Sequence, residues 1–173
     1  MSRALKGAAL TILILAFFCL MSRIDYIVHG VLYDYGLTFS YDWAVDYWLT
    51  YNLTFLAFSI IVSFSYWFGS NKSAKNLKFT IALLVTINAL AVGGLQDILF
   101  FVLWAGGLPP NNVVWWWAPW QYVLGTWTSL TQIGFTVLTI FSTMFVWVLA
   151  TKEKSLGIQA QELDAEGNNE MPR

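Results

Sequence analysis

Hydrophobic side chains are grouped along the chain into four long runs that shorter polar stretches separate. The runs cover residues 4–22, 43–69, 79–104 and 119–150, and a helix needs about 20 such residues to cross a bilayer. The chain is 58% hydrophobic and only 11% charged, which is typical of a polytopic membrane protein and not of a water-soluble domain. The pattern predicts an all-α membrane protein, a four-transmembrane-helix bundle forming a single domain over residues 1–154.

A shorter amphipathic pattern lies between the first two runs. Apolar residues recur at helical spacing over residues 23–35, and Gly36 ends the pattern. We therefore predict a short amphipathic interfacial helix over 23–35, which lies along the membrane surface or folds over the bundle. Residues 155–173 are polar and acidic, and we expect them to form a disordered cytoplasmic tail.

The basic residues predict the orientation of the chain. If all four runs cross the membrane, seven basic residues lie on one side. They are Arg3, Lys6, Lys72, Lys75, Lys78, Lys152 and Lys154. The positive-inside rule then places both termini in the cytoplasm of a multi-pass protein, which we expect in the plasma membrane of a prokaryote. The lipid bilayer is its first expected partner, and nothing in the chain suggests a nucleic acid.

Polar residues form stripes on the predicted spans. The fourth run carries one polar face at steps of three or four residues. Its members are Gln121, Gly125, Thr128, Gln132, Thr136, Thr139 and Thr143. Shorter stripes on the second and third runs consist of Asn52, Ser59, Ser63, Asn88, Gln96 and Asp97. Because polar groups avoid lipid, we expect these stripes to face one another inside the bundle.

Asp97 is the only charged residue inside the third run. A carboxylate in hydrocarbon is costly and normally has a partner, a cavity or a function. Residues at similar depth predict a binding site for a cation, a proton or a small amphiphile. Its members are Asp97, Gln96, Asn52, Thr128, Gln132 and Asp46. The structural alternative is that Asp97 only accepts hydrogen bonds and that the threonine face only packs helices.

A second candidate site uses metal-ligand chemistry. Asp25 and His29 are four residues apart, as are Asp42 and Asp46, so each pair shares a helix face. If the 23–35 helix folds back, these four side chains and Asp97 surround one outward-opening pocket. Carboxylates with one imidazole suit iron, manganese or zinc. In the alternative interpretation, the two outer aspartates start a helix and His29 is a polar tip at the interface.

Other cofactors conflict with the composition. A single histidine excludes bis-histidine haem, and a retinal Schiff base needs a lysine within a span. Cys19 is the only cysteine, which excludes dithiol chemistry. The residues are compatible with a bound metal ion, but they do not identify a cofactor. The tryptophan-rich outer loop predicts an anchor at the membrane interface or a surface for a partner subunit. The anchor residues are Trp115, Trp116, Trp117 and Trp120.

Three functions are compatible with this sequence. The leading prediction is a non-catalytic subunit or assembly partner of a larger membrane complex, with partner subunits or a homo-oligomer. The second is an outward-facing binding or transport protein that uses Asp97. The third is a membrane-embedded metal-dependent enzyme, which a single histidine disfavours. The residues favour a protein without catalytic activity over an enzyme.

Overall fold

The computed structural model describes residues 3–37, 41–70 and 72–152, and their side chains except at 3, 4, 6 and 41–44. These residues form helices and no β-strand. The helices are α1 (Arg3–Asp34), α2 (Tyr41–Phe68), α3 (Ala74–Val92), α4 (Leu95–Leu103), α5 (Trp120–Leu124) and α6 (Ser129–Thr151). Four of them, α1, α2, α3 and α6, are long and apolar enough to cross a membrane, which confirms the predicted number of long apolar helices.

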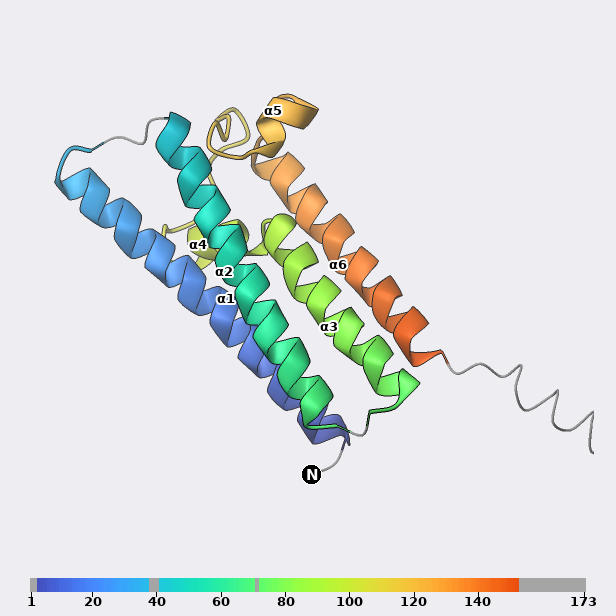
Figure 1. Ribbon diagram of the computed structural model, residues 1–173. Helices are drawn as coiled ribbons and strands as arrows, with labels where there is room; N and C mark the ends of the chain where they lie inside the picture. The colour runs from blue at the N-terminus through green and yellow to red at the C-terminus, as the bar shows by residue number, and fades with distance from the viewer. Residues whose placement is uncertain (1–2, 38–40, 71, 153–173) are drawn as a thin grey trace, which may run out of the picture.

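The four long helices run side by side in alternating directions (Figure 1). The start of α1, the end of α2, the start of α3 and the end of α6 lie at one end of the bundle. The end of α1, the start of α2 and α5 lie at the other end. This arrangement brings the basic segments to a common end. The assignment of that end to the cytoplasm stays a prediction.

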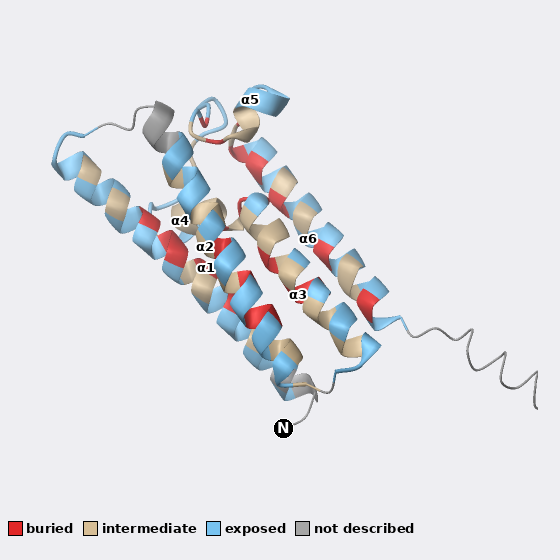
Figure 2. Cartoon of the chain, viewed as in Figure 1, coloured by how far each residue is buried: buried red, intermediate tan, exposed pale blue. Residues whose placement is uncertain are grey.

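The core consists of apolar side chains from α1, α2 and α3. Phe18 is fully buried and its ring lies 4.6 Å from that of Phe55, while Ile87 of α3 completes the contact from the opposite side. The outward faces carry large apolar side chains, with Ile12 67% and Leu138 62% exposed. Figure 2 shows buried residues along the facing sides of the helices and exposed residues on the outer sides. Such apolar outer faces suit contact with lipid.

The first helix is longer than the sequence pattern predicted. It continues without interruption to Asp34, and a separate interfacial helix over 23–35 is not present. No proline interrupts the helix, and a lone glycine such as Gly30 is tolerated within one. Its 32 residues extend about 48 Å, well beyond the roughly 30 Å of a hydrocarbon core. The predicted helical periodicity was therefore correct, but the predicted break was wrong.

The third predicted span is two helices. α3 ends at Val92, and α4 starts at Leu95 and packs against α1. Gly94 has a φ of 72°, in the left-handed region that side chains other than glycine rarely adopt. A Cβ at Gly93 would lie only 2.6 Å from Oγ1 of Thr139 on α6. The Gly93–Gly94 pair therefore allows both the sharp break and the close approach of α6.

Side chains from α5 and α6 bind the carbonyls that the break leaves unpaired. Nε1 of Trp120 donates to the Val92 carbonyl at 3.2 Å. The Gly93 carbonyl accepts from Nε2 of Gln132 at 3.0 Å and from Oγ1 of Thr136 at 2.6 Å. Unpaired backbone groups at membrane depth cost several kcal/mol, so these bonds make the break tolerable. We call Trp120, Gln132 and Thr136 the break clamp.

The fourth predicted span also starts later than expected. The short helix α5 ends at Leu124 and is followed by Gly125, whose φ is 90°, and α6 begins after the extended residue Thr128. The prediction that the polar stripe faces inward is confirmed for Gln132, Thr136 and Thr143, which are buried. The predicted tail, residues 155–173, lies outside the described residues.

Candidate functional site

Asp25 is the centre of a buried polar network that connects three helices. Its side chain accepts a hydrogen bond from the Tyr47 hydroxyl of α2 at 2.6 Å and one from Nε2 of Gln96 of α4 at 2.7 Å. Nδ1 of His29, one turn further along α1, lies 3.0 Å from Oδ1 of Asp25. Asp25 is only 7% exposed. Both oxygens of this carboxylate therefore have protein partners.

Further side-chain bonds hold α2 and α4 against α1. The Tyr51 hydroxyl donates to the Met21 carbonyl at 3.0 Å. Nε1 of Trp104, just after α4, donates to Oγ of Ser22 at 3.0 Å, and the Arg23 guanidinium lies 4.8 Å from the centre of the same indole. The position of α4 beside α1 is therefore fixed at both of its ends.

A cavity of about 350 Å³ lies beside this network, between α1, α2, α4 and the tryptophan-rich loop. Its polar lining groups are Asp25, His29, Tyr47, Asn52, Gln96 and Asp97. Most of the remaining lining residues are aromatic, including Phe100 and Trp117. Pockets for small molecules commonly have this size and this combination of apolar walls with a few converging polar groups.

Asp97 lies in the first turn of α4 and lines the cavity. Within the described part of the chain, its carboxylate makes no hydrogen bond or ion pair. It is nevertheless close enough to Asp25 and His29 to interact with them electrostatically. Asp97 thus differs from Asp25, because its charge faces the cavity without a bonded protein partner.

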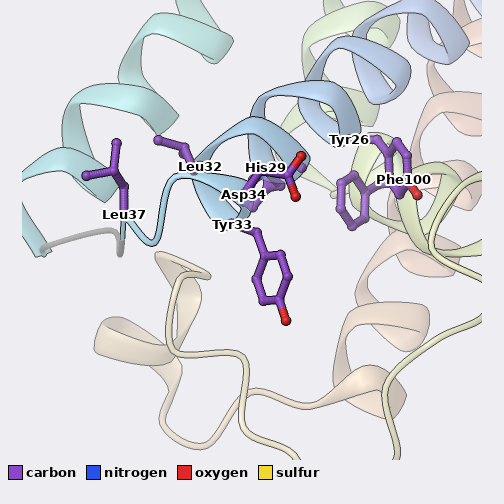
Figure 3. A pocket seen from close by; sticks show the side chains of 8 residues that line it. Tyr26, His29, Leu32, Tyr33, Asp34, Leu37 and Phe100 are labelled. Carbon is purple, nitrogen blue, oxygen red and sulfur yellow. The ribbon is translucent and has the colours of Figure 1, made fainter.

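A second, more open depression lies on the other side of His29. This groove, of about 430 Å³, is lined by residues from the last turns of α1 and by Phe100 of α4 (Figure 3). His29 and Phe100 line both the groove and the cavity, and their rings meet edge to face with centres 5.5 Å apart. The groove and the cavity are therefore adjacent at these two residues.

The structure brings together half of the predicted ligand-binding set. Asp97, Gln96 and Asn52 line the cavity. Thr128 does not line it. This residue caps the start of α6, where its backbone N–H donates to Oγ1 of Thr131 at 2.6 Å. The remaining two residues, Gln132 and Asp46, are also absent from the lining: the former belongs to the break clamp, and the latter is exposed.

The predicted metal set is only partly assembled. Asp25, His29 and Asp97 line the same cavity, but Asp46 does not. The side chain of Asp42 lies outside the described residues. Among the side chains that are described, no group of three or more His, Cys, Asp or Glu is arranged to hold a metal ion.

The tryptophan loop is more buried than an interface anchor would be. Trp115 is fully buried, with its ring centre 5.0 Å from that of Phe101 and 5.5 Å from that of Trp117. The indole of Trp115 therefore belongs to a second apolar core, and the role of the four tryptophans as an interface anchor stays a prediction. Trp116 is 44% exposed and keeps a surface position. Trp120 contributes to the break clamp instead.

Sequence reasoning missed the aromatic part of the site. Tyr47 and Tyr51 are one turn apart on α2 and line the cavity, where they face α1. Their spacing of four residues equals that of Asp25 and His29, which was a signal for two facing polar helix surfaces. Phe100 carried no such signal, because its position depends on the direction of α4 after the break.

The fold and the cavity define a small helical protein with four potential membrane spans and a polar cavity within them. Comparisons with protein-family models, with curated proteins and with solved structures found no match for this chain. Its function is therefore inferred from the cavity alone.

Proposed function

We propose that this protein binds a small amphiphile in the cavity between α1, α2 and α4, as a membrane-embedded binding or transport protein. The observation that carries this proposal is the Asp97 carboxylate, which faces the cavity without a bonded partner. A carboxylate buried at membrane depth is costly and normally has a partner, a cavity or a function. A purely structural role does not explain this cost, because an asparagine of the same shape would avoid it.

The shape of the site fits an amphiphile. Asp25, Tyr47 and Gln96 form one hydrogen-bonded polar group in the cavity lining, and aromatic rings such as Phe100 and Trp117 form much of the rest. Asp25 lies nine residues before the end of α1, which places this polar group about 14 Å below that end of the bundle. A ligand with a polar head and an apolar body matches both parts.

The other two functions have less support. For the subunit function, the exposed apolar faces are expected equally for contact with lipid, so they do not indicate a protein partner. For the metal-dependent enzyme, the described residues contain no group of three suitable ligands. The cavity lined by the Asp97 carboxylate supports ligand binding over these two functions.

The test is native mass spectrometry of the full-length protein, gently solubilised from its own membrane. We expect the wild-type protein to carry a bound small molecule. Ala91→Phe fills the cavity, because Ala91 lines it, and is expected to remove the ligand. Ala57→Phe adds the same bulk on an exposed side of α2 and is the matched control. Extra protein mass without a small molecule would instead support the subunit function.

A further inference from the structure

The cavity carries charges of one sign. Asp25 and Asp97 are its two carboxylates, and no lysine or arginine is among the described residues that line it. His29 contributes at most one positive charge and lies 3.0 Å from Asp25, so it compensates that carboxylate first. The field inside the cavity therefore attracts a cation and repels an anion.

Only one carboxylate is available to a ligand. Asp25 accepts hydrogen bonds from Tyr47 and Gln96 through its two oxygens. Displacing these donors would leave buried polar groups without partners, which costs about 1–3 kcal/mol for each group. Asp97 has no bonded partner to displace. The site therefore offers one negative charge, which one monovalent cation neutralises.

The walls favour an organic cation over a metal ion. A metal ion needs several ligands, and the described residues contain no group of three or more His, Cys, Asp or Glu arranged to hold one. An ammonium group instead binds well to aromatic faces combined with one carboxylate. Tyr47 and Tyr51, whose ring centres are 4.8 Å apart, and Phe100 all line the cavity.

We propose that the ligand is a monovalent organic ammonium ion with an apolar body, whose nitrogen pairs with the Asp97 carboxylate. This inference rests on the proposed binding function and specifies the chemical class of the ligand. The apolar body lies against Phe100 and Trp117, while the Asp25 network keeps the polar part of the cavity lining in place.

The experiment compares two probes of nearly equal size and shape, phenethylammonium and 2-phenylethanol, which differ in charge. Binding to the full-length protein in lipid nanodiscs is measured by isothermal titration calorimetry. We expect the ammonium to bind at least about 30-fold more tightly than the alcohol, because a desolvated charge pair is worth 2 kcal/mol or more. Asp97→Asn is expected to abolish this preference. Asp46→Asn, an exposed carboxylate outside the cavity lining, is expected to retain it.

Each outcome separates the two proposals. If both probes bind equally to the wild-type protein, the ammonium inference is overturned, while binding of amphiphiles stands. If the ammonium preference persists in Asp97→Asn, Asp97 is not the counter-ion and the inference is also overturned. If neither probe binds the wild-type protein and native mass spectrometry finds no small molecule, the proposed function itself fails. The comparison on the wild-type protein does not depend on how any variant folds.

Discussion

Two buried polar clusters lie on either side of Gly94, and they differ in how completely their groups are paired. In the break clamp, the side-chain amide of Gln132 donates to Gly93 and accepts from Nε1 of Trp127 at 2.7 Å. In the neighbouring cavity, both oxygens of Asp25 have bonded partners, whereas Asp97 lines the cavity with no bonded partner among the described residues. Complete pairing without a cavity is typical of a structural role. An unpaired carboxylate beside a cavity is the basis for the proposed ligand.

The degree of burial does not distinguish the break clamp from the cavity cluster. Gln132 is only 1% exposed and is more buried than Asp25 at 7%, yet it serves the fold and not the cavity. Both clusters contain residues that the sequence predicted as ligands. The difference lies in the hydrogen-bond partners, which only the tertiary arrangement supplies.

The largest expected effect is on the break itself. Gly94→Ala forces a residue with a Cβ into the left-handed region, which costs about 1–2 kcal/mol of stability. The added Cβ also overlaps Nε2 of Gln132. With the loss of that clamp bond, we expect a total destabilisation of about 3–4 kcal/mol. Unfolding followed by circular dichroism measures it.

Gly134→Ala is the matched control, because a Cβ there meets nothing within 4 Å and the residue lies within α6. It is expected to leave stability unchanged or to raise it slightly. Equal stability of the two variants would show that the break does not depend on Gly94.

A smaller effect is expected when the clamp loses one member. Gln132→Leu keeps the approximate size but leaves Nε1 of Trp127 without its acceptor and removes one donor to the Gly93 carbonyl. We expect a destabilisation of about 2 kcal/mol in the same unfolding assay, with ligand binding retained.

Thr143→Val is the control for this variant. Thr143 is buried on the same face of α6, but its hydroxyl donates to the Ile140 carbonyl of its own helix. Its stability is expected to change by less than about 0.5 kcal/mol. A similar loss in both variants would mean that any polar group on this face matters equally.

The smallest expected effects on stability are those of replacing each of the two carboxylates, and they differ between Asp25 and Asp97. Asp25→Asn replaces one acceptor oxygen by a donor facing Tyr47 or Gln96, and we expect a loss of about 1–2 kcal/mol. Asp97→Asn breaks no hydrogen bond and is expected to leave stability unchanged or to raise it. If Asp97→Asn were the more destabilising of the two, Asp97 would be structural, and the contrast between the two clusters would be lost.

Much of the fold was predictable from local patterns. Run length predicted the four long helices, and steps of three or four residues predicted the buried face that contains Gln132, Thr136 and Thr143. The stripe on α2 was also correctly placed, since Oγ of Ser59 accepts from Nδ2 of Asn88 of α3 at 2.7 Å. These features follow from the solvation of each side chain and the helical repeat, both of which are local.

The breaks were not predictable in the same way. The Gly93–Gly94 pair is visible in the sequence, but whether such a pair bends or interrupts a helix depends on whether distant groups bind the freed carbonyls. Those groups are Trp120, Gln132 and Thr136, 28 to 43 residues away. Conversely, residues 23–35 carry a pattern that suits a separate helix, but nothing in the structure separates them from α1.

The sequence by itself determined the all-helical class, the number of long apolar helices and the position of a single charge, Asp97, within the third apolar run, because these depend on local hydrophobicity. Only the tertiary structure decided that Asp25 is paired and Asp97 is not. The reason is the direction of α4: after the break it turns toward α1, which brings Gln96 to Asp25, 71 residues away, and leaves Asp97 facing the cavity.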